Sequence, residues 1–224
     1  MPYRHEWKHE ISRCDYLILR QRLRAALKRD EHAGPEGEYR VRSLYFDDDR
    51  DTALREKIDG VNRREKFRIR SYNGCLTPIH LEKKSKINGL CEKRSADLTR
   101  PETEAILRGE IGWMARSRSA LKVELYSKMR GRLLRPAVLV DYIREPFIFP
   151  AGNVRITLDR DIRTGLKCLD FFNPDLPTVP VGDIPALLEV KYDAFLPDFI
   201  VDLLQLPGRR AGAFSKYAAC RSLD

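Results

Sequence analysis

Long apolar runs are missing from this sequence, and their absence excludes a membrane protein built from spanning helices. None of the apolar stretches in the 224 residues approaches the roughly 18–20 residues that cross a bilayer. The first residues, Met-Pro-Tyr-Arg-His-Glu, contain no apolar segment of the kind that a secretory signal peptide needs. Low-complexity tracts are absent too, and 42% of the residues are hydrophobic. We therefore expect a cytoplasmic, globular protein without a transmembrane segment.

Cysteine and histidine are scarce and poorly spaced for metal chemistry. The five cysteines form no Cys-x-x-Cys pair and are scattered along the chain: Cys14, Cys75, Cys91, Cys168 and Cys220. The four histidines form no zinc-ligand pattern either. An odd, dispersed set of cysteines without a signal sequence is typical of reduced thiols in the cytoplasm. No serine–histidine pair, cysteine–histidine pair or P-loop is present, which excludes the common motifs of nucleophilic catalysis and P-loop nucleotide binding.

Positive charge, in contrast, is abundant. The chain has 42 lysines and arginines against 33 aspartates and glutamates, which gives a net charge of +9 and a pI of about 9.4. Such a balance indicates an anionic partner: a nucleic acid, a phosphate-rich metabolite or an anionic membrane surface. The length suits one large domain or two small ones, and we take residues 1–224 as one domain.

The stretch 62–72 concentrates this charge on one side of a predicted β-strand. Because side chains alternate along a strand, Phe67 and Ile69 share one face, and the opposite face carries Arg64, Lys66, Arg68, Arg70 and Tyr72. Like-charged neighbours on that face lie about 6.5–7 Å apart, so each pair costs roughly 2–3 kcal/mol at an effective dielectric near 20. The basic face is therefore either fully solvated or held by a polyanion inside a cavity.

Alternation and turn residues predict the other elements. Further strands are expected at 3–11, 39–46, 79–86, 136–144, 154–160 and 186–192. Helices are expected at 13–29, 49–58, 97–118 (opening near Thr99), 120–132 and 197–206. A short terminal helix is expected after the segment 212–217, and a loop or an irregular strand over 165–182. The aspartate run 47–49 lacks the glycine and distal glutamate of a calcium loop, so we expect it to end a strand and cap a helix.

These elements predict an α+β fold. At least seven strands, mostly at hairpin spacing, carry polar faces of the same basic character. A closed antiparallel β-barrel with helices packed outside would turn those faces inward and the apolar faces toward the helices. The alternative is an open α+β sheet with one solvated basic face.

Pooling the polar faces gives a set of candidate site residues. The cations are Lys8, Arg68, Arg70, Lys84, Lys93, Arg144, Arg155, Lys191 and Lys216, and the interleaved carboxylates are Glu6, Glu82 and Glu189. Lysine and arginine suit phosphate oxygens, and several in one enclosed space suit a polyphosphate. A few carboxylates among them suit Mg²⁺ or Mn²⁺. Phosphoryl transfer needs little beyond such positioning and charge neutralisation.

Six short motifs in order resemble the VTC domain, the catalytic domain of vacuolar-transporter-chaperone type polyphosphate polymerases. They are Lys66-Phe-Arg-Ile-Arg-Ser-Tyr72, His80-Leu-Glu-Lys-Lys84, Asp141-Tyr-Ile-Arg144, Val154-Arg-Ile-Thr-Leu-Asp159, Leu188-Glu-Val-Lys-Tyr192 and Ser215-Lys-Tyr217. The resemblance runs from Glu6 to Tyr217 and places the chain in the triphosphate tunnel metalloenzyme (CYTH-like) superfamily. It implies an eight-stranded antiparallel tunnel that binds triphosphate and polyphosphate with Mn²⁺ or Mg²⁺. Polymerising members transfer the terminal phosphoryl group of ATP to a growing chain.

The resemblance also assigns roles to individual residues. It implies catalytic phosphate contacts from Arg68, Arg70, Lys84, Arg144, Arg155 and Lys216, and further substrate contacts from Lys8, Lys93, Tyr142 and Ser215, to which we add Lys191. The resemblance implies Glu189 as the metal ligand, and we expect Glu6 and Glu82 either to join it or to orient lysines. We expect Arg64 and Lys66 nearer the tunnel mouth and assign them no phosphate.

Two departures from the family pattern matter. The acidic-x-acidic-x-Lys motif of the superfamily appears as Arg4-His-Glu-Trp-Lys8, so one carboxylate is missing. The SPX and transmembrane domains of the eukaryotic polymerase subunits are not in this sequence, which leaves room for a separate membrane partner.

Four functions compete on these residues. A polymerase would make polyphosphate from ATP, and a triphosphatase on the same tunnel would release phosphate from triphosphate. A non-catalytic module would bind polyphosphate without turnover. Nucleic-acid binding through an open sheet is not expected, because no stripe of exposed aromatic residues separates the basic ones.

Overall fold

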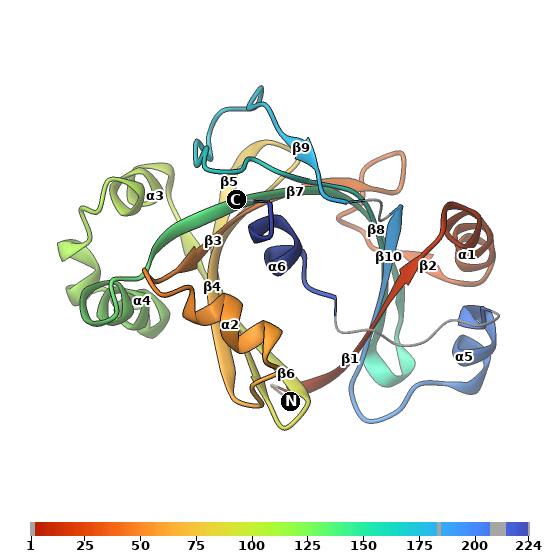
Figure 1. Ribbon diagram of the computed structural model, residues 1–224. Helices are drawn as coiled ribbons and strands as arrows, with labels where there is room; N and C mark the ends of the chain where they lie inside the picture. Colours follow the sequence, from red (N-terminus) through yellow and green to blue (C-terminus); the bar gives the residue numbers. More distant parts are fainter. Residues whose placement is uncertain (1–2, 183–184, 207–213, 224) are drawn as a thin grey trace.

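The computed structural model describes residues 3–182, 185–206 and 214–223. Within them, ten strands form one sheet in the order β2-β7-β3-β4-β5-β6-β1-β10-β8-β9, and β7 also pairs with β8. That additional pairing closes eight of the strands into a ring (Figure 1). All the pairings are antiparallel. The predicted closed barrel of an α+β fold is confirmed, and the open-sheet alternative is excluded.

The barrel strands are long enough to place several side chains each on the inner face. They are β1 (Tyr3–Ile11), β3 (Tyr39–Asp47), β4 (Arg64–Tyr72), β5 (Cys75–Ile87), β6 (Leu90–Leu98), β7 (Arg135–Phe149), β8 (Val154–Thr164) and β10 (Ala186–Tyr192). Two short strands, β2 (Lys28–Arg29) and β9 (Val179–Pro180), pair with β7 and β8 outside the ring. β7 and β8 run further than the predicted strands, because their mutual pairing continues from Val140 to Phe149 on β7.

Two hairpins bring β4, β5 and β6 together, and their turns explain the register. Asn73 and Gly74 have φ values of +53° and +68°, and Asn88 and Gly89 have +50° and +81°. Asn-Gly pairs adopt this left-handed conformation at little cost and match the twist of adjacent strands. The resulting register places Arg68 opposite Glu82 across β4 and β5.

Helices cover two opposite sides of the barrel (Figure 1). α1 (Arg13–Ala26) and α5 (Asp198–Leu204) lie on one side, and α3 (Arg100–Leu107) and α4 (Ala120–Gly131) lie on the other. α2 (Thr52–Ile58) packs beside β4, and α6 (Lys216–Arg221) lies within the ring of strands. Short 3-10 helices occupy Gly112–Arg116 and Ala151–Asn153. No helix in the described ranges is long and apolar enough to cross a membrane.

The predicted helix over 97–118 is confirmed at its opening near Thr99, but it is much shorter than expected. β6 continues to Leu98, and α3 begins only at Arg100, where Thr99 and Glu102 form a capping box. The helix ends at Leu107, and Gly109 then takes a φ of +80°. A glycine in that conformation ends a helix readily because it has no Cβ.

Other predicted boundaries shift by a few residues. The helix expected over 13–29 ends at Ala26, and the next residues pair with β7 as β2. The helix expected over 197–206 spans Asp198–Leu204. In the segment 212–217, residues 212 and 213 lie outside the described residues, and α6 already begins at Lys216.

Three apolar clusters hold the barrel and its helices together. One joins the outer faces of β4 and β5 to α4 through Phe67, Ile69, Leu81, Leu121 and Leu125, among others. A second joins β8 and β10 to α1 and α5, with Ile156, Leu188, Leu19, Leu23 and Ile200. The third includes inward residues of β3 and β7 packed against α6, with Tyr45, Val138, Val140, Tyr217 and Cys220. Apolar packing therefore fills part of the interior and leaves the remaining inward positions to charged residues.

Candidate functional site

A cavity of about 410 Å³ occupies the interior of the barrel, and a smaller one of about 150 Å³ adjoins it. The two adjoin closely, since Glu6, Lys8, Lys66, Lys84 and Ser215 are among the residues lining both. Thirteen of the fourteen predicted site residues line the larger cavity: Glu6, Lys8, Arg68, Arg70, Lys84, Lys93, Tyr142, Arg144, Arg155, Glu189, Lys191, Ser215 and Lys216. The alternation of strand side chains thus gathers them in one space.

Glu82 is the predicted residue outside that lining, and it organises three of the cations from behind. Its carboxylate lies 2.6 Å from Arg68, 3.5 Å from Arg70 and 3.0 Å from Lys93, and the side chain is 1% exposed. Burial alone would raise the pKa of Glu82, but these cations outweigh it and hold the pKa far below its usual range. This geometry favours an orienting role for Glu82 over a metal-binding one.

Asp159 holds two further predicted cations and was not predicted as a site residue. Arg144 lies opposite it across β7 and β8 and donates two hydrogen bonds of 2.6 and 2.7 Å to its two oxygens. Lys216 reaches it from α6 at 2.6 Å. Asp159 shares its strand face with Arg155, so alternation alone could have placed it in the cavity.

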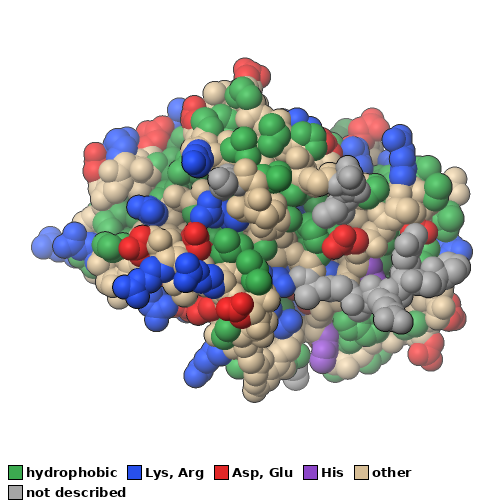
Figure 2. Space-filling model, viewed as in Figure 1, with side chains coloured by type: hydrophobic (Ala, Val, Ile, Leu, Met, Phe, Trp, Pro, Cys, Tyr) green, Lys and Arg blue, Asp and Glu red, His purple; other side chains and the backbone are tan. Residues whose placement is uncertain are grey.

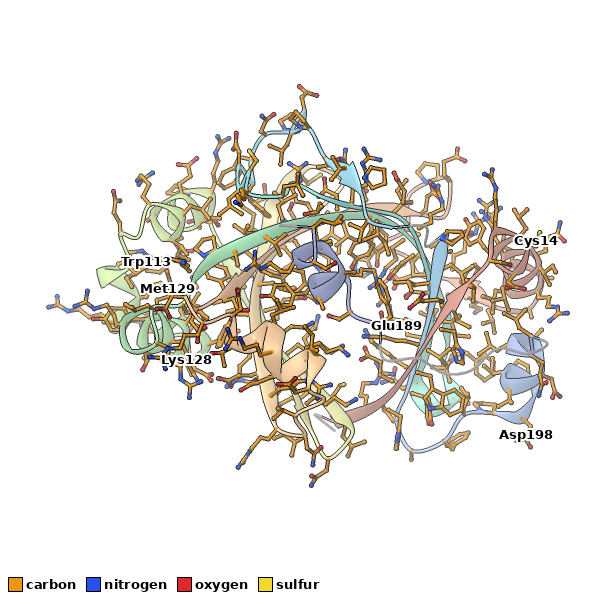
Figure 3. The ribbon with its side chains drawn as sticks, viewed as in Figure 1. Cys14, Trp113, Lys128, Met129, Glu189 and Asp198 are labelled. Carbon is orange, nitrogen blue, oxygen red and sulfur yellow. The ribbon has the colours of Figure 1, made fainter. Side chains whose placement is uncertain are left out.

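Glu6 and Glu189 form the third charged group, on the neighbouring strands β1 and β10. Their register puts Lys8 opposite Glu189 and Glu6 opposite Lys191. Glu6 lies 2.6 Å from Lys84 and 3.2 Å from Lys8, while Glu189 lies 2.9 Å from Lys191. Figure 3 shows Glu189 on β10 in the interior of the barrel.

Both carboxylates of this group are ionised near neutral pH. Burial and the nearby charge of Glu189 raise the pKa of Glu6, but Lys84 and Lys8 outweigh them and lower it to about 2. Burial likewise raises the pKa of Glu189, and Lys191 and Lys8 bring it well below its usual range. Two charged carboxylates near one another repel, and a divalent cation between them would relieve that repulsion.

The carboxylates of this group can be compared with the needs of the Mn²⁺ or Mg²⁺ that the family resemblance implies. The described residues contain no group of three or more histidine, cysteine, aspartate or glutamate side chains that could hold a metal ion by themselves. Mg²⁺, however, is commonly bound by one or two carboxylates plus substrate phosphates. Glu6 and Glu189 fit that incomplete type of site.

Arg155, Arg70 and Tyr142 complete the predicted lining. Arg155 lies 2.8 Å from Asp30 and donates a hydrogen bond of 3.0 Å to the hydroxyl of Tyr39. Arg70 donates to the hydroxyl of Tyr142 at 3.1 Å, and burial raises the pKa of Tyr142 to about 12. The Tyr142 hydroxyl therefore keeps its proton at neutral pH and remains available as a hydrogen-bond donor.

Ser215 lies at the beginning of α6. Its side chain accepts a hydrogen bond of 3.4 Å from the backbone of Ala218. The ammonium group of the next residue, Lys216, lies 4.8 Å from the centre of the Tyr142 ring. α6 thus brings a hydroxyl and a cation into the cavity from a different direction than the strands.

Lys66 and Tyr45 are two lining residues without a predicted role. Lys66 lines both cavities, whereas Arg64 lines only the smaller one. Arg68 donates a hydrogen bond of 2.8 Å to the Tyr45 hydroxyl. Burial lowers the pKa of Lys66 to about 7, although the nearby Tyr45 opposes this shift. Burial alone would raise the pKa of Tyr45, but the charges of Arg68 and Lys66 outweigh it and lower that pKa to about 7 as well.

By its fold and its site, this protein is a closed antiparallel β-barrel whose interior is lined with cations. The family model described as VTC domain matches residues 3–223. The chain therefore belongs to the VTC domain family.

Solved structures share the fold at low sequence identity. The PH1012 protein from Pyrococcus horikoshii is 12% identical with a TM-score of 0.53, over 95% of this chain and 96% of that one. A conserved hypothetical protein from Pyrococcus furiosus is 13% identical with a TM-score of 0.53, over 97% and 99%. A search of curated proteins found no match. These structures support the fold alone.

Proposed function

We propose that this protein is a polyphosphate polymerase that transfers the terminal phosphoryl group of ATP onto a growing polyphosphate chain, with Mn²⁺ or Mg²⁺. Membership of the VTC domain family and the enclosed barrel support a polyphosphate-related tunnel protein. The observation that carries the proposal further is the charge balance of the cavity.

Positive charge exceeds negative charge inside the barrel. Nine predicted cations form ion pairs there with only five carboxylates, which are Asp30, Glu6, Glu82, Asp159 and Glu189. Taking charges out of water is costly unless opposite charges compensate them. A phosphate chain supplies the missing negative charge at regular intervals, and arginine and lysine match its oxygens.

The cation arrangement suits phosphoryl transfer without a protein nucleophile. The attacking oxygen belongs to the end of the chain: its bond to the γ-phosphorus of ATP forms while the bond from that phosphorus to ADP breaks. Arg68, Arg70 and Lys84 would bind the reacting phosphates and stabilise their charge. Arg144 and Lys216, both fixed by Asp159, would hold neighbouring phosphates in line.

Glu189 and Glu6 would hold the divalent cation, which neutralises phosphate charge when bound. Lys8, Lys84 and Lys191 surround these carboxylates, so the free cavity already keeps them ionised. Glu82 would position Arg68, Arg70 and Lys93 without touching the metal.

The proposal is tested by incubating the purified protein with ATP and Mn²⁺ and separating the products on a gel. Polyphosphate and ADP are expected. Glu189→Gln should reduce the rate by at least about a hundredfold, because it removes a ligand of the divalent cation, and losing one electrostatic stabiliser of a transition state costs that much. The matched control is Glu110→Gln, because Glu110 pairs with Arg108 on the exposed surface.

Other outcomes would indicate a different function for the same cavity. Release of orthophosphate from tripolyphosphate without chain growth would indicate a triphosphatase. Tight polyphosphate binding that survives Glu189→Gln, with no turnover of either substrate, would indicate a binding module. Each of these results would contradict the polymerase proposal.

A further inference from the structure

One buried hydroxyl inside the barrel, that of Thr157 on β8, has no hydrogen-bond partner among the described residues. The residue is 2% exposed. Water satisfies polar groups on the outer surface, such as the acidic and basic side chains that Figure 2 shows there. A buried hydroxyl loses that hydration, and without a partner nothing compensates the loss. Because such groups are rare in folded proteins, this one calls for an explanation.

The alternation of β8 turns Thr157 toward the barrel interior. It shares its strand face with Arg155, which lines the larger cavity, while Ile156 and Leu158 lie in the apolar cluster that packs against α1 and α5. Trp113, whose buried indole nitrogen also has no partner within the described ranges, lies outside the barrel instead (Figure 3). Thr157 itself does not line the larger cavity. Its hydroxyl can therefore affect a bound ligand only through a neighbouring residue.

Glu189 is the neighbour that can use this hydroxyl. It lies directly opposite Thr157 across β8 and β10, and directly opposed Cβ atoms in an antiparallel sheet are about 4.5–5.5 Å apart. On the other side, Thr157 lies opposite Pro146 of β7, whose side chain has no polar atom. The two flanking residues on the same strand face already form ion pairs elsewhere.

Two cations hold the Glu189 carboxylate in the free protein. Lys191 lies 2.9 Å from one of its oxygens, and Arg144 donates a longer hydrogen bond of 3.4 Å to the other. A carboxylate offers about four acceptor positions, so room remains for a further donor. Both cations line the cavity in which we propose that phosphates bind. Phosphates that draw these cations away would leave Glu189 in need of another donor.

We propose that Thr157 is a positioning residue for Glu189. When phosphates engage Lys191 and Arg144, the Thr157 hydroxyl donates a hydrogen bond to Glu189 and keeps its carboxylate in the orientation that binds the divalent cation. Groups that hydrogen-bond to metal ligands act in this way in many proteins, and their loss costs about 10–100-fold in metal affinity or activity. The inference rests on the proposed function, because it takes Glu189 as a metal ligand.

The test compares the wild type with Thr157→Val, which removes the hydroxyl and keeps the shape of the side chain. Calorimetry measures tripolyphosphate affinity in EDTA and again with Mn²⁺. The gain in affinity that Mn²⁺ provides should be about tenfold smaller in the variant. Affinity in EDTA should stay within about twofold, because the hydroxyl does not line the cavity. The Mn²⁺ concentration for half-maximal synthesis from ATP should rise by a similar factor.

Thermal stability separates this role from simple packing. Removing a buried hydroxyl that has no partner should raise the thermal midpoint of the free protein by about 2–4 °C. Thr157→Ser keeps the hydroxyl and loses a methyl group, so its midpoint should fall while the gain from Mn²⁺ stays close to that of the wild type.

The matched control is Thr103→Val in α3. Thr103 is also buried, but its hydroxyl donates a hydrogen bond of 2.9 Å to the backbone carbonyl of Thr99. Losing a satisfied hydrogen bond should lower the thermal midpoint. The gain in tripolyphosphate affinity from Mn²⁺ should not change, since Thr103 lies on a helix outside the barrel.

An unchanged gain from Mn²⁺ in Thr157→Val would overturn the positioning role. Equal loss of affinity with and without Mn²⁺ would overturn it too, because the hydroxyl would then contact phosphate directly. A wild-type protein that binds tripolyphosphate no more tightly with Mn²⁺ than in EDTA would instead contradict the metal role of Glu189 in the proposed function. The two failures are therefore distinguishable in the same experiment.

Discussion

Single residues in the cavity are held by charge pairing. Glu82 is nearly inaccessible and fixes the guanidinium groups of Arg68 and Arg70 on one strand. Asp159 does the same for Arg144 and, from α6, for Lys216. Such pairs keep long side chains in one orientation before a ligand arrives, which lowers the entropy lost on binding.

Glu82→Gln is expected to destabilise the free protein by about 3–5 kcal/mol, because it leaves buried cations without their carboxylate. Urea unfolding would measure the loss. Polyphosphate should raise the thermal midpoint of this variant more than that of the wild type, since the ligand supplies the missing negative charge. An unchanged midpoint without ligand would show that Glu82 does not organise these cations.

Lys66 and Tyr45 predict a pH dependence of binding. Each has a pKa of about 7 in the free protein. Above that pH, the lysine is mostly neutral and the tyrosine mostly ionised. Besides the pair itself, the described groups that shift these pKa values face inward from three strands: Lys8 on β1, Arg68 and Arg70 on β4, and Lys84 on β5. A bound polyanion disfavours the phenolate and favours the ammonium group, so it raises both pKa values.

Polyphosphate binding at about pH 8.5 should therefore take up protons, while binding at about pH 5.5 should not, since both groups are already protonated. Titration calorimetry in buffers of different ionisation enthalpy measures this uptake. Lys66→Met and Tyr45→Phe should each reduce it. Equal uptake by the wild type and both variants would contradict the assignment.

At the scale of elements, α2 and α6 are joined through Asp47 at the end of β3. Its carboxylate accepts hydrogen bonds from the backbone of Ala53 and Leu54 at 2.9 and 3.1 Å and from the hydroxyl of Tyr217. The expectation that the aspartate run 47–49 ends a strand and caps a helix is confirmed. Asp47 also anchors α6, which the run alone does not indicate.

Asp47→Ala is expected to cost about 2–3 kcal/mol, since it leaves buried donors unsatisfied. It should also weaken polyphosphate binding, because α2 and α6 both contribute cavity residues. Asp49→Ala is the matched control: Asp49 is exposed in the same run and should have little effect. Denaturation and binding assays on both variants check this, and equal effects would contradict the anchoring role.

Elements with a strong alternating pattern could be predicted, and those without one could not. β1 and β10 span the predicted residues, because charged side chains recur at alternate positions over most of each strand. The helix expected over 97–118 opens near Thr99 as predicted, but residues 97 and 98 belong to β6, whose strand pairing is a long-range interaction that local pattern does not reveal. Gly109 then interrupts the remainder.

At the scale of the whole molecule, the sequence indicated which faces would meet but not how the ring closes. Closure depends on β7 pairing with both β3 and β8 and on β1 pairing with both β6 and β10. Residues as distant as Tyr3 and Glu92 become neighbours in this way. The number of strands came from family resemblance, since periodicity carries no information about long-range pairing.

The candidate site was predicted largely through its cations. Their partners Asp30 and Asp159 were missed. Asp30 follows the short strand β2 and has no distinctive local signal, whereas Asp159 shares a strand face with Arg155 and could have been found by alternation. Lys66 was expected near the tunnel mouth, but it lines both cavities. Its environment depends on where the two cavities adjoin, and local pattern does not reveal that. Local pattern thus identified the charged faces, and only the closed barrel shows which charges are compensated.

The central claim is that the barrel transfers phosphoryl groups from ATP to polyphosphate. Its most direct test follows the radiolabelled γ-phosphate of ATP after incubation with the protein, Mn²⁺ and a short polyphosphate primer. We expect the label in lengthened chains, with ADP released in equal amount, and much less label in chains with Glu189→Gln. Label found only in orthophosphate, or remaining in ATP, would contradict the claim.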